Sequence, residues 1–128
     1  AALWWGSMTL LGVVVVPQLF AYLPTPAIAG GVAAKLFATQ TAVSVGCGLL
    51  ILLCCMKKEG QVQAGWSFDA IAFASAGLLL SLLLEFAVAP RILSRENLKV
   101  WHAVGMVLFF GQGLSAGLLL WKLLGGRR

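Results

Sequence analysis

Long apolar stretches, separated by short polar segments, divide the chain into four parts. The stretches cover about residues 2–22, 32–55, 66–89 and 100–124. About 20 apolar residues are needed for an α-helix to cross a hydrocarbon core of roughly 30 Å, so each stretch is long enough to span a membrane. The pattern predicts an all-α integral membrane protein, a four-helix bundle in a single domain that covers residues 1–128.

The segments between the stretches carry turn and break signals. LPTPAIAGG, residues 23–31, is a connection rich in proline and glycine. Pro17 lies in the last turns of the first stretch, where its missing N–H is expected to kink the helix. Pro90 is expected to end the third helix, because the residue before a proline is disfavoured in the α conformation.

A short internal repeat relates the two halves of the chain. VVVVPQLF, residues 13–20, resembles FAVAPRIL, residues 86–93, and each ends an odd-numbered stretch. GCGLLIL, residues 46–52, resembles SAGLLLW, residues 115–121. The repeat favours two helical hairpins, a 2+2 arrangement, related by an axis along the membrane normal.

The composition agrees with a membrane protein. Hydrophobic residues make up 61% of the chain and charged residues 10%, whereas soluble domains are about half apolar. The net charge of +5 comes largely from residues at the ends of apolar stretches, where they contact lipid headgroups. The predicted partner is therefore the lipid bilayer, with no nucleic acid. Cys47, Cys54 and Cys55 fall in one apolar stretch and predict no disulfide framework.

Basic residues are divided almost evenly between the two membrane sides. The side of the termini carries Lys57, Lys58, Lys122, Arg127 and Arg128, and the other side carries Lys35, Arg91, Arg95 and Lys99. This small excess favours both termini in the cytoplasm, in the inner membrane of a bacterium. The tryptophans near the ends of the stretches are predicted to be interface anchors: Trp4, Trp5, Trp66, Trp101 and Trp121.

Glu85 is the most conspicuous polar residue, because it lies between the apolar segments LLLSLLL and FAVA. A carboxylate in a span costs about 2.5–3.5 kcal/mol unless it faces the bundle interior and finds a partner. With a turn near residues 92–97, Glu85 and His102 both lie roughly 8–10 Å inside their helices, at 1.5 Å per residue. Glu85 is predicted either to handle an ion together with His102 or to form a buried ion pair or hydrogen bond that locks the hairpin. Its partner in the second case would be Arg91, Lys35 or His102.

Other polar residues reach the same half of the bundle. Lys35 and Gln40 enter from that side, and Arg91 and Arg95 are candidates for holding anionic groups. His102 and Met106 share a helix face at i, i+4 spacing, and a His/Met pair suits copper or haem iron. Two ligands do not specify a metal, so the cofactor stays unknown. No nucleotide-binding loop, zinc signature or nucleophile elbow occurs, which predicts that the chain is not an enzyme.

Several short motifs resemble a known family. They are P-x-L-F followed by L-P at residues 17–24, K-L-F at residues 35–37, and H-x-x-x-M at His102 and Met106. In these motifs the chain resembles the domain of unknown function 4149, the transmembrane protein 205-like family, over nearly its whole length. The resemblance implies a four-helix membrane protein of unsettled biochemistry, with an animal relative linked to cisplatin resistance. The family tends to carry Pro-x-Tyr after K-L-F, and an asparagine where this chain has Glu85.

A looser likeness connects the chain to four-helix copper-resistance proteins and to the haem-binding protoporphyrinogen oxidase of bacteria. Those proteins use a histidine in the first span, which this chain lacks, so a haem enzyme is disfavoured.

The leading hypothesis is a small membrane protein that binds or passes a small solute or metal ion through a polar pocket, with Glu85 and His102 as the ion-handling pair. A non-catalytic structural or partner-binding subunit is the alternative, and a haem- or copper-linked redox protein is a third. Four closely packed helices leave little lumen, so transport would require a homo-oligomer or a membrane protein partner.

Overall fold

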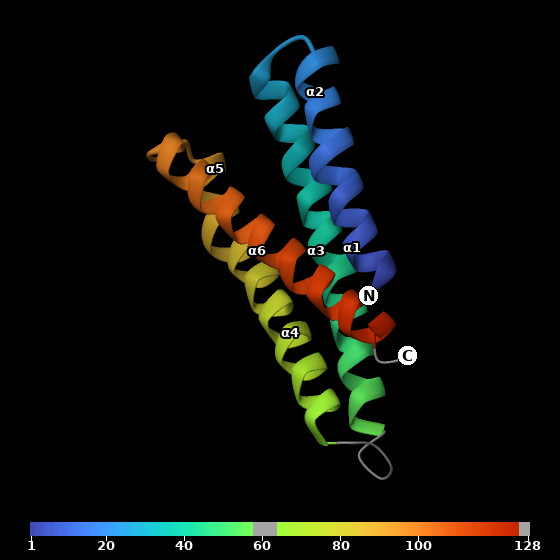
Figure 1. Cartoon of the computed structure of the whole chain (residues 1–128). Coiled ribbons are helices and arrows are strands. Elements are labelled where there is room, and N and C mark those ends of the chain that lie inside the picture. The colour runs from blue at the N-terminus through green and yellow to red at the C-terminus, as the bar shows by residue number, and fades with distance from the viewer. Residues whose placement is uncertain (58–63, 126–128) are drawn as a thin grey trace.

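The computed structural model describes residues 1–57 and 64–125, and its regular elements in this part of the chain are all helical (Figure 1). Four helical segments are long and apolar enough to cross a membrane: Ala2–Tyr22, Pro26–Met56, Phe68–Leu93 and Leu98–Gly125. The predicted all-α four-helix bundle is confirmed, and its apolar spans identify an integral membrane protein. In lipid the backbone must satisfy its own hydrogen bonds, which is why apolar stretches of this length become helices.

Two of the four spans contain a π-helix. The first span consists of α1 (Ala2–Thr9), the π-helix η1 (Leu10–Val15) and α2 (Val16–Tyr22). The second span is α3 (Pro26–Lys57). The third span consists of α4 (Ala64–Leu83), the π-helix η2 (Leu84–Val88) and α5 (Ala89–Leu93), and the fourth is α6 (Leu98–Gly125).

Each π-helix lies just before a proline. Pro17 is the second residue of α2, and Pro90 is the second residue of α5. Proline offers no N–H and its ring clashes with the carbonyl four residues earlier, and the wider π turn relieves both problems. The third span therefore continues through Pro90 to Leu93 instead of ending there. The repeated segments 13–20 and 86–93 thus share one local structure, which agrees with the 2+2 arrangement.

The second span begins at Pro26, earlier than residue 32, where the sequence predicted its start. The hydroxyl oxygen of Thr25 accepts a hydrogen bond from the backbone N–H of Ile28 (3.3 Å), so Thr25 caps the helix. Proline is favoured at the first helical position because its fixed φ suits the helix and its missing N–H would lack a partner there anyway. The connection between the first two spans is correspondingly shorter.

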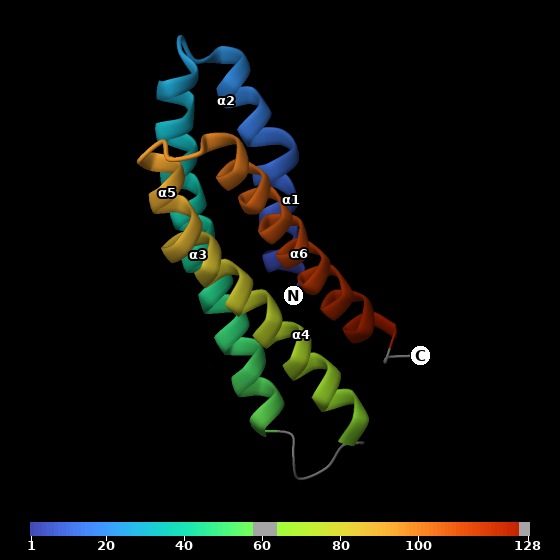
Figure 2. The same ribbon diagram turned by 90° about the vertical axis from the view of Figure 1, so that its left-hand side faces the viewer.

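The two hairpins meet near the end of the bundle that holds the termini and diverge toward the two short loops (Figure 1). α4 lies against both α3 and α6, and α1 contacts α3 and α6 (Figure 2). At the end with the termini, the ammonium group of Lys122 in α6 forms an ion pair with Asp69 in α4.

Trp4 lies at the centre of the core, which the interface-anchor prediction did not foresee. It is fully buried and packs with Met8, Ala74, Ala116 and Leu119. Its ring lies so close to α4 that a Cβ atom on Gly77 would be 2.7 Å from Cη2 of Trp4.

The remaining tryptophans differ from Trp4. Trp5 and Trp121 are exposed, as lipid-facing anchors would be, and Trp101 is partly buried. Trp66 lies outside the residues whose side chains are described. The anchor prediction is thus wrong for Trp4, and for Trp5, Trp101 and Trp121 it stays a prediction.

Candidate functional site

A buried hydrogen-bonded network joins three of the four spans. The indole Nε1 of Trp4 donates to Oγ of Ser44 (2.9 Å), and Nε2 of Gln112 donates to the same oxygen (2.7 Å). Ser44 and Gln112 are buried. Polar groups in a bilayer find no water, so the network holds the first span, α3 and α6 in register. In the described part of the chain every side-chain nitrogen or oxygen that is completely shielded from the surroundings has a hydrogen-bond partner.

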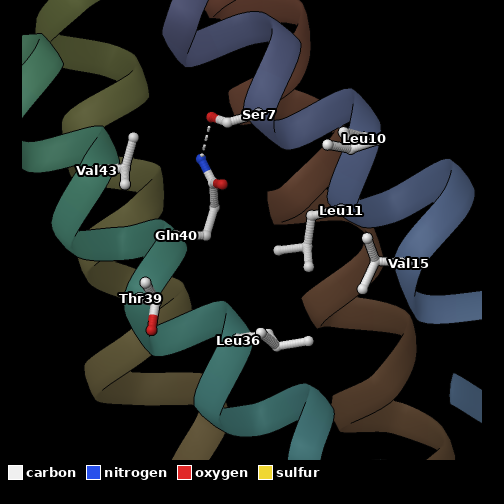
Figure 3. A pocket seen from close by; sticks show the side chains of 8 residues that line it. All are labelled: Ser7, Leu10, Leu11, Val15, Leu36, Thr39, Gln40 and Val43. Atoms are coloured by element: carbon white, nitrogen blue, oxygen red, sulfur yellow. Dashed lines mark hydrogen bonds between the residues drawn. The ribbon is translucent and has the colours of Figure 1, made fainter.

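A second polar contact lies between the first span and α3. Nε2 of Gln40 donates to Oγ of Ser7 (3.0 Å), and the hydroxyl of Ser7 donates to the backbone carbonyl of Trp4 (3.0 Å). This contact forms the floor of a groove of about 220 Å³, which we call the π-helix groove (Figure 3). Its walls are Leu10, Leu11 and Val15 on one side, and Leu36, Thr39 and Val43 on the other.

Glu85 lies in η2 and is partly buried. α3 and α4 pack so closely that a Cβ atom on Gly48 would be 2.6 Å from Cγ of Leu78. α3 also contacts η2, the π-helix that holds Glu85.

Serine hydroxyl groups lie within the third span and within α3. Ser81, one turn before Glu85, is fully buried and donates to the carbonyl of Leu78 (2.8 Å). Ser44 stands one turn from Thr41 and belongs to the network with Gln112. Both hydroxyl groups are buried inside the bundle.

The other predicted site residues lie apart from Glu85. Lys35, Arg91, Arg95 and His102 are exposed, and within the described residues Glu85 forms no hydrogen bond or ion pair with any of them. The guanidinium of Arg91 instead lies over the ring of Trp101, 4.4 Å from its centroid. The structure brings Arg91 to α6 by this cation–π contact, and the pairing of Glu85 with His102 stays a prediction.

The residues considered for metal binding are on the surface. His102 and Met106 are both exposed on α6. Among the residues whose side chains are described, no three histidines, cysteines or acidic residues lie close enough together to hold a metal ion. A metal site at His102 would therefore need ligands from outside the described residues.

The sequence reasoning missed three residues of the two polar contacts. Ser44 and Gln112 of the buried network, and Ser7, which bonds Gln40, were not singled out, although each is a polar residue inside an apolar span. A polar side chain inside a span gains from a hydrogen-bond partner in the bundle interior. Gln40 and Ser44 are four residues apart, as are Ser81 and Glu85, so one-turn spacing would have marked the polar faces of α3 and of the third span.

The family model described as Domain of unknown function (DUF4149) matches residues 1–100, and the chain belongs to this family. The matched part includes Ser7, Gln40, Ser44 and Glu85, and it ends before His102, Met106 and Gln112. No curated protein and no solved structure matches the chain.

Proposed function

We propose that this member of the DUF4149 family binds a small cation within the membrane, and that Glu85 supplies the charged ligand. The observation that carries the proposal is that Glu85 is partly buried in a span and has no hydrogen-bond or ion-pair partner among the described residues. A charged side chain in this position costs about 2.5–3.5 kcal/mol unless it is compensated. A bound cation or cationic solute provides that compensation.

The proposed ligand groups suit an ion that prefers oxygen ligands. Thr41 is 8% exposed, and its hydroxyl has no hydrogen-bond partner within the described residues. A carboxylate and hydroxyl oxygens favour hard cations such as Na⁺, Mg²⁺ or Mn²⁺ over copper or zinc. The short-loop end, where the hairpins diverge, is the proposed entrance, with His102 as an outer group. Lys35, Arg91 and Arg95 are proposed to hold lipid phosphates around it.

The second candidate is a structural or partner-binding subunit. It is favoured by the network of Trp4, Ser44 and Gln112, which joins three spans, and every completely shielded side-chain nitrogen or oxygen among the described residues has a partner. In this case Glu85 would serve only to pair with a group on another membrane protein or a second copy.

Carboxyl modification tests the cation site. Dicyclohexylcarbodiimide, an apolar reagent for carboxyl groups, should modify the purified protein in lipid nanodiscs at Glu85. Saturating Na⁺, K⁺, Mg²⁺ or Mn²⁺, each added alone, identifies the bound cation by slowing the modification measured by intact-protein mass spectrometry. The variant Glu85→Gln should lose the modification, whereas Asp69→Asn, whose carboxylate is paired with Lys122, should keep it.

A calorimetric measurement of cation binding shows how much Glu85 contributes to the affinity. Hydrogen bonds and contacts to a charged group are worth about 1.5–3 kcal/mol, so Glu85→Gln should weaken cation binding roughly ten- to a hundredfold by calorimetry. Its unfolding midpoint should stay close to that of the unmodified chain. Absence of protection by any of the four cations, together with a lower midpoint for Glu85→Gln, would contradict the cation site and favour the structural role.

The orientation of the chain is a further prediction. Both termini are proposed to lie in the cytoplasm, because the side of the termini has the small excess of basic residues. A fluorescent protein that folds only in the cytoplasm should fluoresce when fused after Arg128. A periplasmic alkaline phosphatase fusion at the same position should be inactive, and the reverse result would invert the topology.

A further inference from the structure

The π-helix groove lies between the first span and α3, and it combines apolar walls with one polar floor (Figure 3). We propose that this groove binds the end of an uncharged, lipid-soluble molecule through a hydroxyl group. The proposal concerns a second site and does not depend on cation binding at Glu85.

The floor of the groove has unused hydrogen-bonding capacity. Gln40 is only 8% exposed, and its amide donates one hydrogen bond, to Ser7. No hydrogen bond within the described residues reaches its Oε1, which in Figure 3 points toward the space between the two helices. A primary amide offers two N–H donors and one oxygen acceptor. A hydroxyl can donate to this oxygen and accept from the second N–H, so it matches both free groups.

The depth of Gln40 in the membrane means that lipid headgroups, water and acyl chains do not satisfy its amide. It stands about 21 Å along α3 from Pro26, at 1.5 Å per residue, and therefore near the middle of a span of 31 residues. Headgroups stay at the interface and water is absent from the hydrocarbon core, so ordinary acyl chains would leave the amide unsatisfied. A molecule whose polar end lies inside the bilayer can reach it.

The walls of the groove define the rest of the ligand. Leu10, Leu11, Val15 and Val43 offer only hydrocarbon, and a charged group among them would be costly. The volume of about 220 Å³ is smaller than the roughly 300–1,000 Å³ of pockets that enclose a whole drug-sized ligand, so the groove accepts one end of a longer molecule. η1 contributes Leu10, Leu11 and Val15, and π turns often occur at functional sites.

Photolabelling with a matched pair of probes tests this site. One probe is a long-chain alkanol with a diazirine near the hydroxyl end, and the other is the alkane with the diazirine on the same carbon. In phosphatidylcholine nanodiscs the alkanol should label residues 10–15 and 36–43 more strongly than the alkane does. In Gln40→Met, which keeps the side-chain shape, alkanol labelling should fall roughly two- to tenfold, as expected for about 0.5–1.5 kcal/mol, while alkane labelling should not change.

A second variant keeps the test decisive if Gln40→Met folds poorly. Val43→Trp should fill the groove from α3 while leaving Gln40 in place, and should lower labelling of these segments by both probes. Labelling of residues 117–124, which line a separate groove with Trp5, serves as the internal reference and should be unchanged. Equal labelling by the two probes, or alkanol labelling that survives both substitutions, would overturn the proposal.

Discussion

Replacement of Trp4 by alanine is expected to lower the free energy of unfolding by about 2–3 kcal/mol. In soluble proteins a buried tryptophan loses about 3–5 kcal/mol on such truncation, which includes the transfer of the side chain from water. In a micelle or bilayer the unfolded chain is also in an apolar medium, so the lost packing and the cavity dominate. Trp4 is fully buried among four spans, so the cavity has little room to collapse.

Unfolding of the purified protein in mixed micelles, followed by circular dichroism as a denaturing detergent is added, measures this effect. Trp121 is 78% exposed, so Trp121→Ala is the matched control and should change the free energy by less than about 0.5 kcal/mol. Trp4→Phe should lie between the two, because it keeps much of the ring but removes the hydrogen bond to Ser44, worth about 0.5–1.5 kcal/mol. Similar losses for Trp4→Ala and Trp121→Ala would contradict the central position of Trp4.

Hydropathy alone predicted the four spans, because a chain in lipid has few alternatives to the helix. It did not predict the place of Trp4. The residue is near the start of the first span, yet it contacts Ser44, about 20 Å from the end of α3 at 1.5 Å per residue. Trp4 therefore lies at the level of the middle of α3, a relation that depends on how the two helices pack and that hydropathy does not predict.

Of the proposed cation site, the sequence predicted Glu85 but not the residues that surround it. Glu85 stands out from its sequence neighbours because charge in a span is costly. Its surroundings depend on the register of α3 against the third span, and the close approach of Gly48 to Leu78 is one contact that sets this register. Pro17 and Pro90 each leave a backbone carbonyl without its usual N–H partner, and the helix can respond by a kink or by a π turn. The apolar pattern does not show which of the two responses occurs.

Gly77→Ala is expected to lower the free energy of unfolding by about 1–2 kcal/mol, although alanine is the better helix former. The new Cβ would lie 2.7 Å from Cη2 and 2.9 Å from Cζ2 of Trp4. The ring is rigid and fully buried, so α4 must move away from the first span. The strain of overpacking, about 1–3 kcal/mol, exceeds the gain in helix propensity of up to about 1 kcal/mol.

Gly113→Ala is the matched control, because nothing lies within 4 Å of a Cβ atom at that position in α6. It should leave the free energy of unfolding unchanged or raise it slightly in the same micelle titration. Because the new methyl group meets no neighbour, this variant reports helix propensity without a packing effect. A double-mutant cycle adds the decisive measurement: in the Trp4→Leu background the six-membered ring is gone, so Gly77→Ala should lose most of its cost. A cost that is the same in both backgrounds would mean that Gly77 and Trp4 are not in contact, and that the first span and the third pack differently.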